Sequence, residues 1–232
     1  MDSDLEWYFG WLAEELKNKK EHCERTVIYC QTIKQCGIIY GVLKGMLGQD
    51  LIIRTDTGEQ HPLLEMLHSC TPDQNKNNII SSFQSEKGTV RLLVATIAFG
   101  MDVDCKGVCR VIHYGPSKNV ETFVQETGRA GRDGSQSTSY LLYQGMLLNH
   151  VDGDIKCFIR NTKCTRKTLL NYFQSDCEKP DIAHLSILLL PTARLQNACK
   201  ISNAQRGRKD TKVLSIERST DASKTTSGRT AD

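Results

Sequence analysis

The most unusual stretch of the chain is the run Val124-Gln125-Glu126-Thr127-Gly128-Arg129-Ala130-Gly131-Arg132-Asp133-Gly134. On a helix, the spacing of its two arginines would place them one turn apart. Small residues at 128, 130 and 131 would let another surface approach the backbone closely. A planar, permanently charged guanidinium group beside such a surface suits the phosphates of a nucleotide. The alternative is a glycine-rich turn with solvated arginines, because short motifs also arise by chance.

The same stretch resembles motif VI of superfamily 2 helicases in the RecQ form, Gln-Glu-x-Gly-Arg-Ala-Gly-Arg-Asp-Gly. A second segment is similar to RecQ motif V, whose common form is Ala-Thr-x-Ala-Phe-Gly-Met-Gly-Ile-Asp; residues 90–104 here read Val-Arg-Leu-Leu-Val-Ala-Thr-Ile-Ala-Phe-Gly-Met-Asp-Val-Asp. The resemblance is close over residues 24–143 and looser to about residue 175. It departs at Asp102, where the family usually has Gly, and an acidic side chain there could repel a DNA phosphate.

The resemblance implies a part of an ATP-dependent 3′–5′ DNA helicase that works with ATP and Mg²⁺. Arg129 and Arg132 would stabilise charge on the phosphates as the bond breaks. Gln125 would sense the state of the nucleotide. The resemblance also assigns Gly128, Asp133 and Asp104 to nucleotide binding, with the Asp133 carboxylate orienting an arginine.

The DNA contacts that the resemblance implies lie in and near motif V. Thr96, Gly100 and Met101 would touch the sugar–phosphate backbone, so binding would be independent of base sequence. His113 stands at the end of an expected strand, before Tyr114-Gly115-Pro116. Two interpretations of it stay open: a contact with nucleic acid, or a structural histidine whose hydrogen bonds are satisfied within the fold.

Short apolar runs alternate with helical patterns along the chain and predict an α/β fold. The expected strands are residues 26–30, 90–95, 108–113 and 138–143, and residues 48–62 are expected to be a loop. We expect a mostly parallel sheet with helices on both faces, which fits the RecA-like fold that the resemblance implies. Because ligands of such sheets gather at the carboxyl ends of the strands, we expect both motifs at that edge.

Four parts are expected along the chain. Residues 1–22 form an amphipathic helix that packs on the domain; a stacking platform for nucleic acid built from its aromatic residues is the alternative. Residues 23–145 form the second RecA-like domain, and residues 146–185 form a partial RecQ zinc-binding helical subdomain. Residues 186–232 carry nine Lys or Arg and four Asp or Glu, and we expect a disordered basic tail, with nucleic-acid contact as the alternative.

The zinc site is expected to be incomplete. Cys164 precedes a basic stretch as in the family, and Cys177 matches a second ligand, but the resemblance stops after His184. A structural zinc ion needs four ligands, so zinc binding is doubtful.

Composition adds expectations about where the protein is located. The net charge is +3, the ten cysteines fall within expected strands and helices, and we find neither a signal peptide nor an apolar run of the roughly 18 residues that span a bilayer. We therefore expect a reducing intracellular compartment and no membrane partner. The resemblance adds the nucleus, with the cytoplasm as an alternative, and a role in DNA repair and recombination.

The sequence contains neither the phosphate-binding pattern G-x-x-x-x-G-K-[ST] nor an Asp-Glu-x-His box. We therefore expect the chain to need a separate first RecA-like domain as its partner and to be inactive alone. A non-catalytic module that binds DNA or protein, and a degenerate relic without activity, are the other two interpretations.

Overall fold

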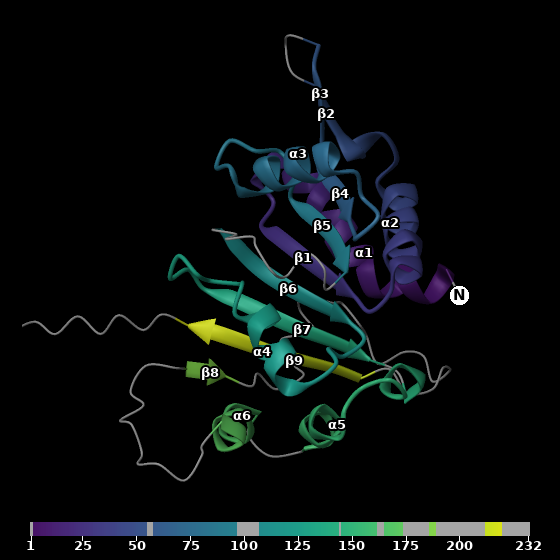
Figure 1. The fold of residues 1–232 in the computed structure, drawn as a ribbon. Coiled ribbons are helices and arrows are strands. Elements are labelled where there is room, and N and C mark those ends of the chain that lie inside the picture. Colours follow the sequence, from purple (N-terminus) through teal and green to yellow (C-terminus); the bar gives the residue numbers. More distant parts are fainter. Residues whose placement is uncertain are drawn as a thin grey trace, which may run out of the picture.

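The structure is a computed structural model that describes residues 2–54, 58–96, 107–143, 145–161, 165–173, 186–188 and 212–219. Five neighbouring parallel strands form most of the main sheet of the described residues, from one edge inward, which confirms the predicted α/β class (Figure 1). Their order across the sheet is β4-β5-β1-β6-β7. Their bounds are Arg25–Cys30 (β1), Leu64–Leu67 (β4), Leu92–Thr96 (β5), Val108–Tyr114 (β6) and Ser137–Tyr143 (β7).

Helices cover both faces of this sheet, also as predicted. The helices α1 and α2 pack on one face, α3 packs on the other, and α4, α5 and α6 gather beside β7 (Figure 1). Every residue of the central strand β1 is buried, as expected of a parallel strand between two helical layers. The bounds are Asp2–Lys19 (α1), Ile33–Leu47 (α2), Asp73–Gln84 (α3), Val120–Thr127 (α4), Gly153–Arg160 (α5) and Thr165–Phe173 (α6), with 3₁₀ turns at Lys20–His22 (η1), Gly48–Leu51 (η2) and Gly145–Leu148 (η4).

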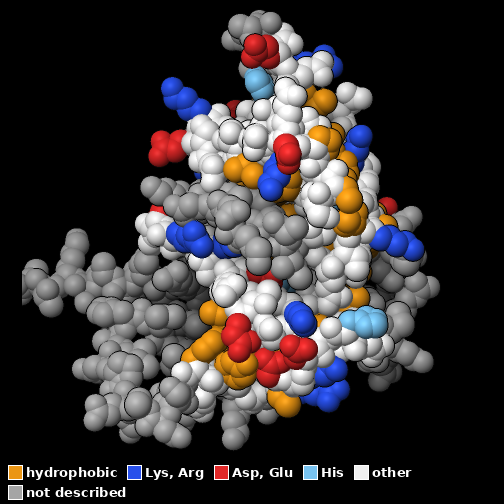
Figure 2. Space-filling model, viewed as in Figure 1, with side chains coloured by type: hydrophobic (Ala, Val, Ile, Leu, Met, Phe, Trp, Pro, Cys, Tyr) orange, Lys and Arg blue, Asp and Glu red, His pale blue; other side chains and the backbone are white. Residues whose placement is uncertain are grey.

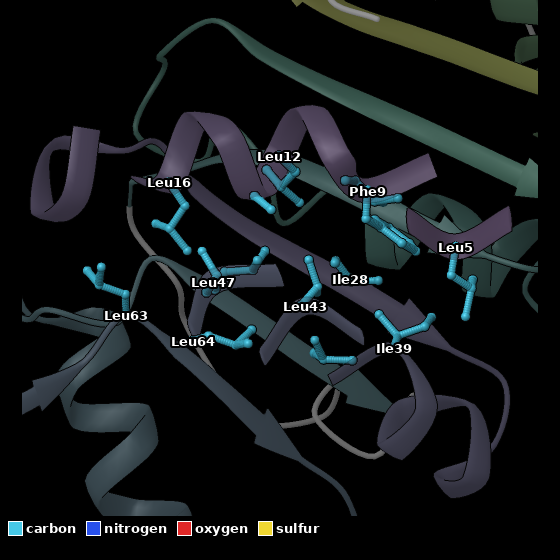
Figure 3. Packing of buried hydrophobic residues seen from close by; sticks show 14 of the residues in the cluster. Leu5, Phe9, Leu12, Leu16, Ile28, Ile39, Leu43, Leu47, Leu63 and Leu64 are labelled. Carbon is cyan, nitrogen blue, oxygen red and sulfur yellow. The ribbon is translucent and has the colours of Figure 1, made fainter. Parts of the chain in front are cut away.

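The largest core cluster lies between α1, α2 and the sheet. The apolar stripe of α1 points onto β1 and α2 (Figure 3); its members are Leu5, Phe9, Leu12 and Leu16. Helix α2 begins with a capping box, in which Thr32 accepts from the Gln35 backbone N–H and the Gln35 side chain accepts from Thr32 N–H. None of the described helices is long and apolar enough to cross a bilayer.

Two segments differ from the expected loop and tail. Residues 48–62 hold η2 and a hairpin of β2 (Ile52–Arg54) and β3 (Gln60–Pro62). Within the stretch expected to be disordered, β9 (Lys212–Ser219) pairs antiparallel with β7, and β8 (Ser186–Leu188) pairs with β9. Unpaired backbone groups along the outer edge of β7 explain why a further strand adds there. The other residues of 186–232 lie outside the described ranges.

Candidate functional site

Helix α4 carries the first part of the arginine motif. Two side chains accept hydrogen bonds from backbone N–H groups at its N-terminus, and a third side chain supports one of the two. The Asn119 side chain accepts a hydrogen bond from Thr122 N–H at 2.9 Å, and Asp154 of α5 accepts from Val120 N–H at 3.1 Å. The Tyr172 hydroxyl of α6 donates to Asp154 at 3.0 Å. The helical appendage therefore docks directly on the helix that leads into the motif.

This docking region is visible on the surface. Figure 2 shows acidic side chains beside hydrophobic ones over the part of the molecule where Figure 1 draws α4 and α6. Glu121, which accepts from the Tyr172 hydroxyl at 2.6 Å, and the exposed aromatic residues Tyr172 and Phe173 belong to it. The two carboxylates that surround its hydroxyl raise the pKa of Tyr172.

Residues 128–134, here named the arginine turn, follow α4 and lead into β7. Gly131 has a φ of 68° and its N–H donates to the carbonyl oxygen of Val108 at 2.9 Å. Val108 is the first residue of β6, so the arginine turn lies at the amino edge of the parallel strands. This corrects our expectation of the carboxyl edge. The reason is that α4 starts after the carboxyl end of β6 and carries the chain back toward the amino edge before β7 begins.

The predicted nucleotide-side residues differ in exposure. Gln125, Gly128, Arg132 and Asp133 are exposed, whereas Arg129 is buried, with 8% of the residue exposed. Asp133 accepts hydrogen bonds from the backbone N–H and the hydroxyl of Ser135, which lower the pKa of its carboxyl. Asp133 thus holds the shape of the turn, and its role in orienting an arginine stays a prediction.

The predicted DNA-side residues do not all lie in the described part of the chain. Gly100 and Met101 fall outside it, as do Asp104 of the nucleotide set and both predicted zinc ligands, Cys164 and Cys177. Thr96 is described: it is the last residue of β5, at the carboxyl edge of the sheet, and is 8% exposed. Among the described residues no three His, Cys, Asp or Glu side chains come together as a metal site.

His113 is buried rather than presented to solvent. Its side chain is 1% exposed and stacks on Tyr29, with a ring-centroid distance of 5.4 Å. Its Nε2 lies 2.9 Å from Oε2 of Glu126, which also accepts from the Ser117 hydroxyl at 2.5 Å. In this structure the imidazole therefore has no surface to offer to DNA. It is a buried histidine, and among the described residues only its Nε2 has a hydrogen-bond partner, so its hydrogen bonding is satisfied in part.

Glu126 is a buried residue of the motif for which the sequence predicted no role. It lies on the face of α4 that buries Val120 and Phe123, three residues from the latter. A carboxylate at a core position of an amphipathic helix was the signal that could have found it, because buried acids are rare unless they are paired.

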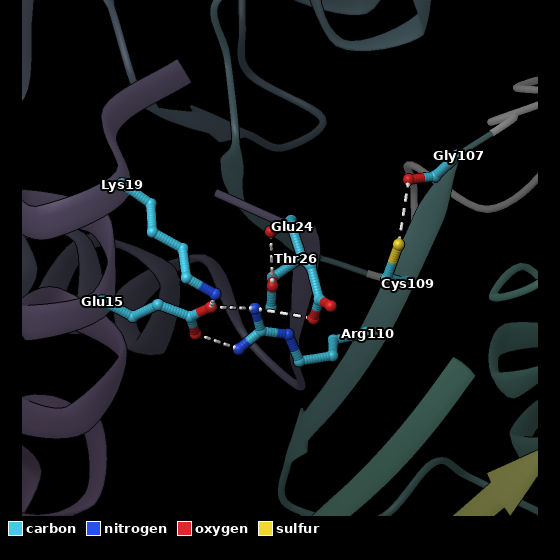
Figure 4. Close-up of polar contacts among 7 residues, drawn as sticks. All are labelled: Glu15, Lys19, Glu24, Thr26, Gly107, Cys109 and Arg110. Atoms are coloured by element: carbon cyan, nitrogen blue, oxygen red, sulfur yellow. Dashed lines mark hydrogen bonds and ion pairs between the residues drawn. The ribbon is translucent and has the colours of Figure 1, made fainter. Parts of the chain in front are cut away.

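A second overlooked group lies at the amino edge. Arg110 of β6 donates to both carboxylate oxygens of Glu15, at 2.5 and 3.0 Å, and pairs with Glu24 at 2.9 Å (Figure 4). Its guanidinium group also lies 5.4 Å from the ring centre of Trp11. These contacts attach α1 to β6. The same side chains line a polar pocket of about 500 Å³, together with Gln136, which lies just before β7.

The amino edge also carries further positive charge. Arg25 begins β1, and its guanidinium group donates to the carbonyl oxygen of Ser85. Burial and the neighbouring charge of Arg25 lower the pKa of Arg91, which precedes β5. Together with Arg132, these groups make the edge attractive to an anion.

Comparison with known proteins gives one family and several relatives. A model of the helicase conserved C-terminal domain matches residues 7–134. The ATP-dependent helicase wrn-1 of Caenorhabditis elegans is 33% identical over 146 residues, which cover 63% of this chain and 12% of that protein. The ATP-dependent DNA helicase hus2/rqh1 of Schizosaccharomyces pombe is 31% identical over 177 residues, which cover 67% and 12%.

Two further likenesses are shorter or more distant. The RecQ-like DNA helicase blm-1 of Caenorhabditis elegans is 35% identical over 117 residues, covering 50% of this chain and 10% of that protein. The second domain of the DEAD-box helicase Mss116p, bound to an RNA duplex, is 17% identical with a TM-score of 0.49, covering 60% of this chain and 49% of that one. The chain spans about a tenth of the length of the three curated relatives.

Proposed function

Because the chain belongs to the helicase conserved C-terminal domain family, with RecQ helicases among its relatives, we propose that it supplies the arginine side of the ATP site of a 3′–5′ DNA helicase. ATP with Mg²⁺ would be held mainly by a first RecA-like domain, since the sequence contains no phosphate-binding loop pattern. The chain alone is then expected to be inactive.

The observation that carries this proposal is the placement of Arg132. It is exposed on a turn whose backbone is tied to β6 by the Gly131 N–H and shaped by the Asp133 hydrogen bonds. A guanidinium group on a fixed backbone can meet a phosphate that a neighbouring domain presents, and its electrostatic effect requires little reorganisation. Arg129 is mostly covered, so it would reach a phosphate only if closure of the two domains shifts the turn.

The residues around Arg132 fit contact with phosphate. Gly128 is exposed and has no side chain to hold a second surface away. Gln125 is exposed one turn before Arg129 and would hydrogen-bond a phosphate oxygen or the attacking water. Bound ATP supplies the bond that is cleaved; the contribution of these side chains is to bind its phosphates and to stabilise the growing charge.

DNA would be contacted at the opposite edge. Thr96 ends β5 at the carboxyl edge, where motif V begins, and backbone contact there would be independent of sequence. Nucleotide and DNA would thus meet different edges of one sheet, so strand separation would depend on coupling across it.

The test is an ATPase assay of the purified chain mixed with a separately made first RecA-like domain of a RecQ helicase. We expect no ATPase of the chain alone, restored ATPase in the mixture, and a loss of kcat of at least about 100-fold in Arg132→Ala, because an arginine finger contributes about 10³ to 10⁵ in rate. Arg129→Ala is expected to lose activity as well. Arg54→Ala, on the exposed hairpin β2–β3, is the matched control and should keep full activity.

Restored ATPase that survives both Arg129→Ala and Arg132→Ala would overturn the proposal. Binding of the chain to forked DNA without any restored ATPase would instead favour a non-catalytic DNA-binding module.

A further inference from the structure

The buried side chain of Glu126 contacts two segments that precede α4 in the chain, and its backbone leads into the arginine turn. Its Oε2 lies 2.9 Å from Nε2 of His113 on β6 and 2.5 Å from the hydroxyl of Ser117, in the loop after β6. Its backbone carbonyl oxygen accepts a hydrogen bond from Arg129 N–H at 3.2 Å, at the start of the arginine turn. One residue therefore touches β6, the loop at the carboxyl edge and the start of the arginine turn.

A buried carboxylic acid is energetically unfavourable at this position. Glu126 is 3% exposed, and among the described residues its Oε1 and the Nδ1 of His113 have no hydrogen-bond partner. Ionic groups buried with incomplete hydrogen bonding often stabilise a fold less than apolar residues of similar size. Leucine or methionine would fill the same helix face beside Phe123, so packing alone does not explain the carboxylate.

What the carboxylate does provide is a directional contact. A hydrophobic side chain would let the last turn of α4 slide or rotate against β6, whereas two hydrogen bonds to one oxygen define its position. The imidazole cannot adjust freely, because it packs against the rings of both Tyr29 and Phe123, with centroid distances of 5.4 and 5.0 Å. The hydroxyl of Ser117 belongs to a loop that Gln31 also holds, through a hydrogen bond to the Pro116 carbonyl oxygen.

We propose that Glu126 is a positioning residue for the arginine turn. By accepting hydrogen bonds from His113 and Ser117, it fixes the position of the last turn of α4 and hence the positions of Arg129 and Arg132. The inference rests on the proposed function for its catalytic consequence, but not for its structural part. It also makes Ser117 a link between the carboxyl edge, where DNA would bind, and the turn at the amino edge.

The experiment compares Glu126→Ala, Glu126→Gln and Ser117→Ala with the unchanged chain in two measurements. The first is hydrogen exchange of the Arg129 and Gly131 amides in the chain alone. The second is kcat and KM for ATP in the mixture with a first RecA-like domain. Ile79→Val, a core change in α3 on another part of the sheet, controls for a general loss of stability.

We expect Glu126→Ala to speed amide exchange at Arg129 and Gly131 at least about tenfold and to lower kcat at least about tenfold, with KM within about twofold. Glu126→Gln should return both values to within about threefold of the unchanged chain, because an amide oxygen accepts the same two hydrogen bonds. Ser117→Ala should fall between them, and Ile79→Val should leave kcat unchanged.

Exchange and kcat within about twofold of the unchanged chain in Glu126→Ala would refute the inference, as would a Glu126→Gln variant that is impaired as much as Glu126→Ala. If Glu126→Ala does not fold, Ser117→Ala, which removes one donor and opens little space, decides: unchanged exchange and kcat would refute it. If Glu126→Ala speeds exchange in the chain alone while the ATPase of the mixture is unaffected by Arg132→Ala, the positioning role stands and the proposed function is rejected.

Discussion

At the scale of single residues, two glycines of the arginine turn differ in why a side chain is unfavourable there: the backbone conformation, or the lack of space for a Cβ. Gly131 and Gly134 both have positive φ, 68° and 83°, where side chains are unfavourable. A Cβ at Gly131 would lie 2.6 Å from the Ser137 hydroxyl oxygen and 2.8 Å from the Ser135 carbonyl oxygen, whereas a Cβ at Gly134 would meet no atom within 4 Å. Both positions therefore favour glycine by their backbone conformation, but only at Gly131 do neighbouring atoms also leave no room for a Cβ.

We predict that Gly131→Ala lowers the free energy of unfolding by about 3 kcal/mol and Gly134→Ala by about 1 kcal/mol, because the second change adds only left-handed strain. Urea denaturation of the two variants measures the difference, and Gly134→Ala is the matched control. Equal losses in both variants would show that the turn relaxes around the methyl group added at position 131 without resistance from β7.

At the scale of elements, the docking of α1 on β6 combines apolar burial with one ionic contact. The apolar stripe of α1 provides area, but Arg110 and Glu15 provide the register of the helix on the strand. Burial raises the pKa of Glu15, yet the hydrogen bonds and charges of Arg110 and Lys19 outweigh it, so the pKa lies below its ordinary value of 4.5. The sequence distance between the partners, 95 residues, makes this contact a tertiary one.

This lowered pKa predicts a pH dependence. A carboxyl whose pKa is lower in the folded state contributes stability above its unfolded value, and the contribution is lost as pH falls through the folded value. We therefore expect Glu15→Gln to lower the free energy of unfolding by about 2 kcal/mol at about pH 7 and to flatten its decline below pH 4.5.

Urea denaturation between about pH 7 and about pH 3 measures the effect. Glu14→Gln, the same change on the exposed side of α1, should follow the unchanged chain at every pH. An unchanged acid slope in Glu15→Gln would mean that the ion pair does not persist in solution.

At the scale of the whole molecule, the sheet separates the two sites that we propose for nucleotide and for DNA. The arginine turn lies at the amino edge, and Thr96 lies at the carboxyl edge. Between them run β5 and β6, which flank β1. If DNA and nucleotide use different edges, then a link such as the Glu126 contact is needed to connect them.

We predict that the chain binds forked DNA weakly and without sequence preference, because backbone contacts dominate. With about three phosphate contacts, the affinity should fall about 40-fold between about 50 and 200 mM salt. Fluorescence anisotropy with two forks of equal shape and unrelated sequence measures both properties. A fixed preference for one sequence, or an affinity indifferent to salt, would contradict backbone contact at the carboxyl edge.

The sequence by itself determined the class of the fold and the location of the arginine motif along the chain. Alternating apolar runs and helical patterns predicted β1, β5, β6 and β7 as parallel strands, and the structure confirms them. This was possible because the period of apolar residues is a local property of the chain, and a strand buried between two helical layers is mostly apolar.

Only the tertiary structure decided which edge of the sheet the arginine turn occupies, that His113 is buried against Glu126, and that β9 completes the edge of β7. Each of these depends on where segments far apart in sequence meet. A buried carboxylate or arginine is tolerable only where its partner arrives from another element, and no local pattern states which partner that will be.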